Sequence, residues 1–265
     1  MVDVHQVGPG GPTAADVERF VADGVLAVPG AVPRDLAERC RDLVLADAGI
    51  DPDDRATWTR PVVRIVDRHT GAVAEAAHSP RLLAATDALL GAGRWVTYAG
   101  MGSFVVRVPH PDDPGDDGWH VDASLPPDDD PTSTDYLRWG VNARSDGRAV
   151  LWLMLFSEVG PDDAPTRIRL GSHRRLAAAL APTGDASTSP YPLPPLDDLP
   201  IALATGAPGD VYLCHPFLVH AAQRHRGTVP RVLAQPGRPW VGRPDPGRPA
   251  AERNAVEEAI ARATA

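Results

Sequence analysis

Two pairs of a histidine and an aspartate, each with one residue between them, have the types and spacing to bind a metal ion. His120 and Asp122 form one pair, and His110 and Asp112 form the other. In a strand, residues two apart point to the same side, so an imidazole and a carboxylate can both reach one ion. With nine histidines and 35 acidic residues in 265, about one such pair is expected by chance. Spacing alone therefore leaves both pairs open.

The surroundings of the two pairs favour His120 over His110. His110 lies in "PHPDDPGDD", where three prolines oppose regular strand pairing, so a solvated loop is the better interpretation. His120 follows Gly118 and Trp119, and an aromatic side chain there could form the wall of a pocket. Redox-active divalent ions are commonly bound by two histidines and one carboxylate, with the opposite positions open. A second histidine must therefore come from elsewhere in the chain.

The stretch "GDVYLCHPFLVHAAQRHRGTVPR", residues 209–231, offers His215, His220 and His225. His220 ends the apolar patch "FLVH", and Arg231 follows eleven residues later at the start of the run "RVLAQ". A histidine that ends one strand and an arginine on the next can both face the interior of a barrel. There a planar guanidinium can bind a carboxylate through two parallel hydrogen bonds, although a surface ion pair is the ordinary role of an arginine.

Composition restricts the class of protein and its partners. A length of 265 residues, 43% hydrophobic and 23% charged, is typical of a globular protein with its own core. The formal net charge is −9 and no segment concentrates positive charge, which argues against a nucleic-acid partner. All 26 basic residues are arginines, so a lysine-based mechanism is excluded.

The cellular compartment is indicated by cysteine usage and by the N-terminus. The two cysteines, Cys40 and Cys214, lie in apolar segments and predict no disulfide framework. No apolar run approaches the roughly 20 residues that cross a bilayer, and "MVDVHQVGPGG" lacks the regions of a signal peptide. We expect a cytoplasmic protein without a membrane partner, and the sequence carries no signal for a particular oligomeric state.

Helical patterns occupy the first third of the chain. "TAADVERFVADG" begins at a cap, Thr13, and ends at Gly24. "PRDLAERCRDLVLADAG" (33–49) and "SPRLLAATDALLG" (79–91) show the same punctuation by proline and glycine. Between them, "RPVVRIVD" could be a short strand. Residues 249–265 predict a short amphipathic helix.

From about residue 95 the pattern changes to short β runs broken by proline and glycine. The runs are "RWVTY", "SFVVRV", "AVLWLMLFSEV", "TRIRL", "DVYLCH" and "RVLAQP". Such runs are typical of an antiparallel sandwich or barrel. Residues 181–200 are too rich in proline for a core element and predict a surface loop or lid. No internal repeat or linker is visible, so we expect a single domain over residues 1–265.

Taken together, these motifs resemble the phytanoyl-CoA dioxygenase family. "GWHVDAS", "GPDDAPTRIRLGSHRR" and the 209–231 stretch occur in the order and spacing of that family, and "FVADGVLAVPGAVPRDLAERCRDL" is similar to its opening. The resemblance implies a mainly β fold with flanking helices and a double-stranded β-helix core, a cupin-like jelly roll. We expect a helical N-terminal third that packs on a β core from about residue 95 to 240.

Roles for four residues follow from the resemblance. His120 and Asp122 match the proximal metal ligands, and His220 matches the distal histidine. Arg231 matches the arginine that binds the far carboxylate of 2-oxoglutarate. His215 and His225 fit the family spacing less well, so His220 is preferred.

Two further segments bear on the resemblance. Gly171-Ser172-His173 matches a common family segment, which we interpret as a structural turn and not as a source of ligands. Where the family usually has Glu-Asn-Gly-Pro before that segment, this chain has "PDDAPT". The contacts that the family makes there are therefore not carried over to this chain.

The activity implied by the resemblance is oxygenation that depends on Fe(II), with 2-oxoglutarate and O2 as cosubstrates. Oxidative decarboxylation of 2-oxoglutarate would release succinate and CO2. The reaction would be coupled to the oxidation of an unactivated C–H bond of the substrate. Halogenating relatives lack the carboxylate of Asp122, so its presence favours hydroxylation or another oxidation such as desaturation. By analogy, the substrate would be a small molecule of bacterial specialised metabolism or one derived from an amino acid.

Substrate recognition and the reaction class both have alternatives. A recognition surface could be formed by Trp119, Arg138, Trp139, Asn142 and Arg144, although solvated hairpin residues are an equal interpretation of the last four. A cupin-like metal-dependent hydrolase would use the same three ligands but leave Arg231 without a role. A non-catalytic ligand-binding β-helix module would need neither the ligands nor the arginine.

Overall fold

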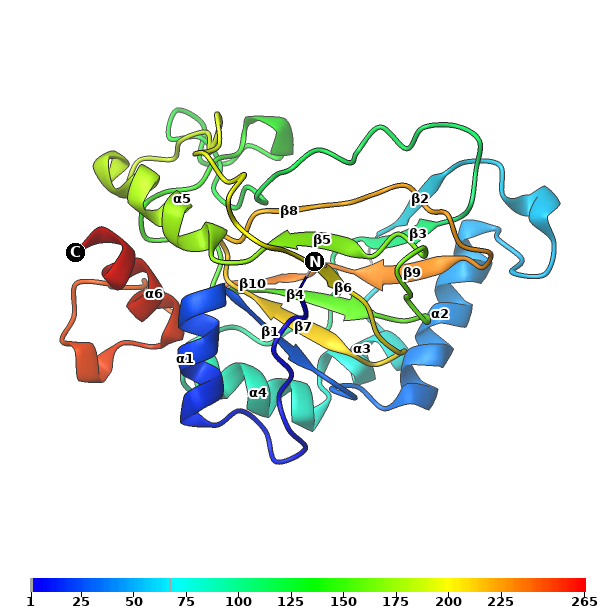
Figure 1. The fold of residues 1–265 in the computed structure, drawn as a ribbon, viewed down its shortest axis with the longest axis horizontal. Coiled ribbons are helices and arrows are strands. Elements are labelled where there is room, and N and C mark those ends of the chain that lie inside the picture. The colour runs from blue at the N-terminus through cyan, green and yellow to red at the C-terminus, as the bar shows by residue number, and fades with distance from the viewer. Residues whose placement is uncertain (1, 67) are drawn as a thin grey trace.

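Two antiparallel sheets lie face to face, and helices cover the outer face of the larger one (Figure 1). The computed structural model describes residues 2–66 and 68–265. The strands are β1 (Val25–Val28), β2 (Val62–Ile65), β3 (Phe104–Arg107), β4 (Val150–Leu155), β5 (Thr166–Arg169), β6 (Ile201–Ala204), β7 (Val211–Cys214), β8 (His220–Ala221), β9 (Arg231–Ala234) and β10 (Gly237–Arg238). The larger sheet has the order β1-β7-β4-β9-β3-β2 with β10 paired to β4, and the smaller sheet has the order β6-β5-β8.

The helices gather around the larger sheet and at its two ends. They are α1 (Ala14–Asp23), α2 (Arg34–Ala48), α3 (Ala72–Ala77), α4 (Pro80–Leu90), α5 (Ser172–Leu180) and α6 (Ala255–Thr264). In Figure 1, α1, α5 and α6 lie at one end of the sheets and α2 at the other. None of the described helices combines the length and apolar character that a membrane crossing requires.

Alternation along β4 explains how one strand serves two layers. Trp152 and Met154 belong to the cluster that includes the helices, and Trp152 donates a hydrogen bond from Nε1 to Thr86 of α4 at 3.1 Å. Leu151 and Leu153 point the other way and pack with Ile168 of the smaller sheet. Because successive side chains of a strand point to opposite faces, a six-residue apolar strand fills both layers. The interior between the sheets is therefore lined by alternate residues of β4, β7, β9 and β3.

The predicted helices of the first third are confirmed. α1 begins after Thr13, whose side chain accepts from the Asp16 amide while the Asp16 carboxylate bonds back to Thr13, and it ends at Gly24 with a φ of 82°. α2 and α4 fall within the predicted ranges 33–49 and 79–91. The mainly β core with two antiparallel sheets is confirmed as well.

Several elements differ from the sequence prediction. The run "RWVTY" contributes only an isolated bridge between Trp95 and Trp240 and no strand. Trp95 is instead held by its side chain, which donates to Asp87 at 2.8 Å and packs edge-on against Trp152. β1 and β6 were not predicted; β1 follows α1 after a single glycine, in the third of the chain that was expected to be mainly helical. α5 was not predicted either; it begins immediately after Gly171, within the segment interpreted as a turn.

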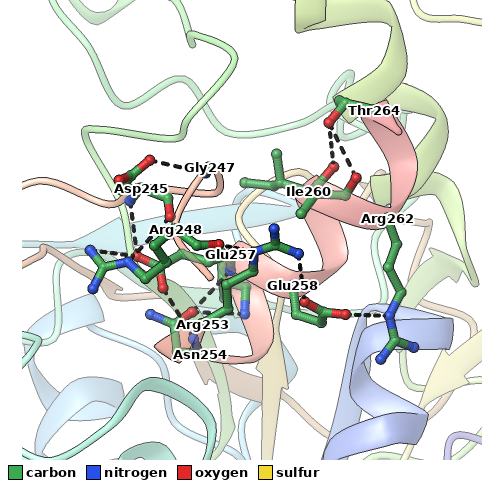
Figure 2. Close-up of polar contacts among 12 residues, drawn as sticks. Asp245, Gly247, Arg248, Arg253, Asn254, Glu257, Glu258, Ile260, Arg262 and Thr264 are labelled. Atoms are coloured by element: carbon green, nitrogen blue, oxygen red, sulfur yellow. Dashed lines mark hydrogen bonds and ion pairs between the residues drawn. The ribbon is translucent and has the colours of Figure 1, made fainter. Parts of the chain in front are cut away.

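The C-terminal helix is held by a buried carboxylate, as Figure 2 shows. Glu257 is fully buried and accepts from the backbone amides of Asn254 at 3.0 Å and Asp245 at 2.9 Å. Arg94, which precedes the β core, pairs with the same carboxylate at 2.6 Å. α6 itself packs against α1 and α5 at one end of the molecule.

Candidate metal centre

The two histidines predicted as ligands are held side by side by backbone hydrogen bonds. His120 forms an isolated antiparallel bridge with His220 of β8, and each amide donates to the carbonyl of the other residue at 2.9 Å. The imidazole centroids are 4.5 Å apart and their planes are inclined by 56°. A residue from an irregular segment is thus fixed against a strand that is 100 residues away in sequence.

Each imidazole is fixed in one tautomer by a carbonyl oxygen. The Nδ1 of His120 lies 2.9 Å from the Gly118 carbonyl oxygen, and the Nδ1 of His220 lies 3.0 Å from that of Leu218. Because a carbonyl oxygen only accepts, Nδ1 must carry the proton, which leaves the lone pair on Nε2. The Nε2 of His220 is buried and has no hydrogen-bond partner in the described chain. A buried acceptor of this kind fits a metal ligand.

Asp122 completes a group of three. One of its carboxylate oxygens lies 3.8 Å from the Nε2 of His120 and 3.9 Å from that of His220. The three ligand atoms all lie within 4.8 Å of one another. Because metal–ligand bonds of about 2.1 Å put neighbouring donors roughly 3–4 Å apart, only small side-chain movements are needed. His120, Asp122 and His220 could therefore hold a metal ion.

Electrostatics keep His220 and Asp122 in the forms that bind cations. Burial lowers the pKa of the His220 imidazole below its ordinary value, although the Asp122 carboxylate acts in the opposite direction. Burial raises the pKa of Asp122, but the neighbouring imidazoles and the Arg148 guanidinium outweigh it and hold that pKa below the usual range. Arg148 lies 3.4 Å from the second carboxylate oxygen of Asp122 and donates to its backbone carbonyl at 3.2 Å. Neutral His220 and ionised Asp122 suit a divalent cation.

A cavity of about 390 Å³ opens beside the three residues. Its lining includes both histidines, Arg231 and three side chains that sequence reasoning did not identify, Arg64, Arg107 and Tyr191. Arg231 is only 2% exposed and donates from NH1 to the Ala164 carbonyl at 2.7 Å, while its Nε has no partner among the described residues. A buried guanidinium with an unused donor beside a metal-binding group is suited to an anionic ligand.

Signals for the missed residues were weak. Arg107 is the one charged residue of the apolar run "SFVVRV", and its register opposite Arg231 becomes visible only in the sheet. Arg64 lies in the short strand β2 and faces the same cavity. Tyr191 belongs to the proline-rich 181–200 segment, whose path back to the cavity no local pattern indicates.

The residues predicted to recognise substrate are divided by the structure. Trp119 lines the cavity, and the guanidiniums of Arg167 and Arg169 lie over its ring at 5.0 and 4.8 Å. The other four are outside the set of lining residues. Each makes its contacts elsewhere: Arg138 pairs with Asp129, the indole of Trp139 donates to Ser133, Asn142 donates to Asp146, and Arg144 pairs with Asp185. A substrate role for these four stays a prediction.

The remaining candidate histidines lie apart from the group of three. The Nδ1 of His110 accepts from the Asp112 amide, which closes a small turn on the surface. His215 is buried against the ring of His173, with centroids 4.8 Å apart. His225 accepts from the Gly227 amide at 3.1 Å. Each of these imidazoles therefore has a local structural contact.

Known structures of the same fold bind metal and 2-oxoglutarate. The epimerase SnoN from nogalamycin biosynthesis, solved with Fe3+, alpha ketoglutarate and nogalamycin RO, is 17% identical with a TM-score of 0.56, covering 84% of this chain and 81% of that one. HygX from Streptomyces hygroscopicus, solved with nickel, 2-oxoglutarate and hygromycin B, is 19% identical with a TM-score of 0.52 over 86% and 87% of the two chains. EctD from S. alaskensis, solved with 2-oxoglutarate and 5-hydroxyectoine, is 18% identical with a TM-score of 0.55 over 89% and 79%. At these identities the likeness is one of fold.

Sequence comparison is more specific about ancestry. No curated protein matches the chain. The phytanoyl-CoA dioxygenase (PhyH) family matches residues 20–233, a span that contains His120, Asp122, His220 and Arg231. Because this match extends over most of the sequence, the chain belongs to the phytanoyl-CoA dioxygenase family.

Proposed function

We propose that this protein is an Fe(II)- and 2-oxoglutarate-dependent oxygenase that hydroxylates an unactivated C–H bond of a small molecule and releases succinate and CO2. The observation that carries this proposal is the convergence of His120, His220 and the buried Arg231 on one cavity. A metal-binding group alone suits many enzymes. A metal-binding group that shares its cavity with a buried guanidinium suits an enzyme with an anionic cosubstrate.

His120, Asp122 and His220 would hold the iron, in the kind of two-histidine, one-carboxylate site that leaves room for other ligands. The 2-oxo acid end of 2-oxoglutarate would lie on the side of His120 and His220, and its far carboxylate would bind Arg231 through charge-assisted hydrogen bonds. When bound, the iron with 2-oxoglutarate and dioxygen supplies the oxidising power, and the protein supplies orientation and exclusion of water. Fixed imidazole tautomers and a buried arginine are the parts of that framework that the chain itself provides.

The cavity supports a small-molecule substrate. Its volume of about 390 Å³ is that of a ligand pocket, and Trp119 and Tyr191 provide aromatic walls. SnoN, HygX and EctD were each crystallised with a small molecule beside alpha ketoglutarate or 2-oxoglutarate. This favours a substrate from bacterial specialised metabolism for the present chain, by analogy of fold.

We also propose that residues 1–265 form one domain that acts in the cytoplasm. One buried cluster joins residues of α1, α2, the larger sheet and α6, which supports a shared core. Cys40 and Cys214 are both buried free thiols, as suits a reducing compartment.

The metal site can be tested without knowledge of the substrate. Anaerobic protein with Fe(II) and 2-oxoglutarate should develop a visible charge-transfer band, because the 2-oxo acid chelates the ferrous ion. His220→Ala should abolish the band and Arg231→Leu should weaken it. His110→Ala is the matched control, because it removes the imidazole from the other His-X-Asp pair and should leave the band intact. Zinc binding without any 2-oxoglutarate binding would instead support the hydrolase alternative.

The type of oxidation can be tested with isotopically labelled dioxygen and the mass of the product. With labelled dioxygen, slow turnover without substrate should place one labelled oxygen atom in succinate, and the product of a true substrate should gain the other. Among proteins of this fold are an epimerase and a carbocyclase. A product with the same mass as its substrate would contradict hydroxylation and favour an epimerase.

A further inference from the structure

Three arginines converge on the face of the larger sheet that lines the cavity. In the β3–β9 register Arg107 lies opposite Arg231, and in the β2–β3 register it lies opposite Val62. Arg64 is two residues from Val62 and therefore shares its face. Arg107 and Arg231 are each 2% exposed, whereas about half of the Arg64 side chain is exposed. Two buried guanidiniums on neighbouring strands repel each other, and an anion between or beside them offsets this repulsion.

A single carboxylate partly neutralises this cluster. Asp116 places one oxygen 2.6 Å from Arg107 and 2.8 Å from Arg64. The residue belongs to the loop between β3 and His120, only four positions before the proposed ligand. Burial raises the pKa of Asp116, but the two guanidiniums hold it below the usual range, so the carboxyl is ionised at neutral pH. Three positive charges and one negative charge leave the cluster with a surplus of two.

Three polar atoms of this cluster, two donors and one acceptor, are buried without a hydrogen-bond partner among the described residues. They are the Nε of Arg107, the Nε of Arg231 and the second oxygen of Asp116. Burial, followed by the charge of Arg107, lowers the pKa of Arg231, and Asp116 acts in the opposite direction. The two guanidiniums thus have donors to offer an incoming carboxylate, but Asp116 presents a like charge to the same ligand.

We propose that Asp116 is an internal counter-ion of the cosubstrate site, which stabilises the arginine cluster when it is empty and weakens its affinity for the dicarboxylate. This inference rests on the proposed function, since it assumes that 2-oxoglutarate enters the cavity. Asp116 occupies donors of Arg107 that would otherwise be directed at the ligand, and it repels the carboxylate that binds Arg231. The affinity for 2-oxoglutarate is then set by competition between the Asp116 carboxylate and the ligand carboxylate for the same arginines.

The test is a titration of 2-oxoglutarate into Ni(II)-loaded protein, in which nickel replaces iron so that bound ligand is not turned over. Asp116→Asn keeps the size of the side chain and an oxygen that can accept from both Arg107 and Arg64, but it removes the charge. We expect it to bind 2-oxoglutarate about tenfold more tightly, because a unit charge a few ångströms from the ligand is removed from a partly buried site. Asp117→Asn, the neighbouring and exposed position, removes the same net charge from the loop and should change the affinity less than twofold, about the level of a screened surface charge.

A second variant should change the affinity for 2-oxoglutarate in the opposite direction. Arg64→Gln removes a half-exposed guanidinium, so Asp116 is less neutralised and repels the ligand more strongly. We expect its affinity for 2-oxoglutarate to fall several-fold. Unchanged or weaker binding by Asp116→Asn, or unchanged binding by Arg64→Gln, would overturn the counter-ion role. If the wild-type protein bound no 2-oxoglutarate at all, the proposed function itself would fail.

Thermal unfolding gives a readout that needs no metal. In the presence of a chelator, Asp116→Asn should unfold at a lower temperature than wild type, since the arginines lose their counter-ion. Glutarate, which has both carboxylates but no 2-oxo group to bind a metal, should raise that temperature more in Asp116→Asn than in wild type. An equal or smaller shift in the variant would contradict the proposal, even where the variant is too unstable for the titration.

Discussion

At the scale of single residues, the proposed site depends on atoms that never touch the metal. The carbonyls of Gly118 and Leu218 select the tautomers of His120 and His220, and such outer partners orient ligands and raise their basicity. Arg148 has a similar position beside the carboxylate. Its guanidinium contacts one oxygen of Asp122 at 3.4 Å and leaves the other directed at the imidazoles.

Replacement of Arg148 should therefore loosen the metal. In Arg148→Met the Asp122 carboxylate loses the contact that orients it, and we expect metal affinity to fall roughly 10- to 100-fold, as for other outer partners. Titration with Co(II) under anaerobic conditions measures the change. Arg144→Met is the matched control, since its guanidinium pairs with Asp185 away from the cavity. Equal affinities for the two variants would exclude an orienting role for Arg148.

At the scale of elements, the short strand β8 needs support from a helix. Ser172, the first residue of α5, is fully buried and its Oγ accepts from the Val219 amide at 2.9 Å. Val219 directly precedes His220, so the helix start and the proposed ligand are joined by one hydrogen bond. The segment Gly171-Ser172-His173 thus has a structural role, as the sequence suggested, but it forms the start of a helix and not only a turn.

Loss of this hydroxyl should lower stability. Ser172→Ala leaves the buried Val219 amide without a partner, and we expect the free energy of unfolding to drop by about 1–3 kcal/mol. Urea denaturation followed by circular dichroism measures it. In contrast, Ser189→Ala removes a hydroxyl that accepts from the exposed Tyr191 amide and should cost no more than about 0.5 kcal/mol. Similar losses in both variants would contradict the special role of Ser172.

The C-terminal helix offers a second prediction at this scale. Glu257 is fully buried and accepts two backbone hydrogen bonds, from Asn254 and Asp245, as drawn in Figure 2. It also pairs with Arg94. Glu257→Gln keeps the shape but removes the charge, and we expect a loss of roughly 1.5–3 kcal/mol in unfolding free energy. Glu252→Gln, at an exposed position of the same segment, should stay within about 0.5 kcal/mol of wild type. A stable Glu257→Gln variant would show that the charge is dispensable.

At the scale of the whole molecule, the sheets and the end helices meet at a buried pair of imidazoles. His173 of α5 packs against His215, which follows β7, and His173 contacts the Val21 carbonyl of α1 at 3.1 Å. Burial lowers the pKa of His173 to about 4, and burial also lowers that of His215 well below its ordinary value. Both are neutral in the folded protein at neutral pH.

This pair should make stability fall with acidity. An unfolded chain protonates each histidine below about pH 6.5, whereas folded His173 stays neutral down to about pH 4. The contribution of His173 to the free energy of unfolding is therefore fully present above about pH 6.5. It is lost as the pH falls toward about 4, at about 1.4 kcal/mol per pH unit. The free energy of unfolding of metal-free protein can be measured by urea denaturation at several pH values across this window. Its slope against pH should be shallower by about that amount in His173→Asn than in wild type. Identical slopes would mean that His173 is not buried as a neutral group.

The sequence by itself determined several of the local elements and the residues proposed as metal ligands. Thr13 and Gly24 specified the ends of α1 because caps are local. His120, Asp122 and His220 could be selected because their types and order carry the family pattern, and the structure brings these same three together. Short strands such as β1 escaped prediction, since four buried residues show no alternation that separates them from a helix end.

Only the tertiary structure decided what surrounds those ligands. The approach of His120 to His220, the opposition of Arg107 and Arg231, and the contact of Asp116 with both Arg64 and Arg107 are pairings between distant segments. Strand register and loop path create them, and both depend on the packing of the two sheets, which no local pattern encodes. The residues that could bind a metal were therefore visible in the sequence, whereas the charge balance beside them became visible only in the fold.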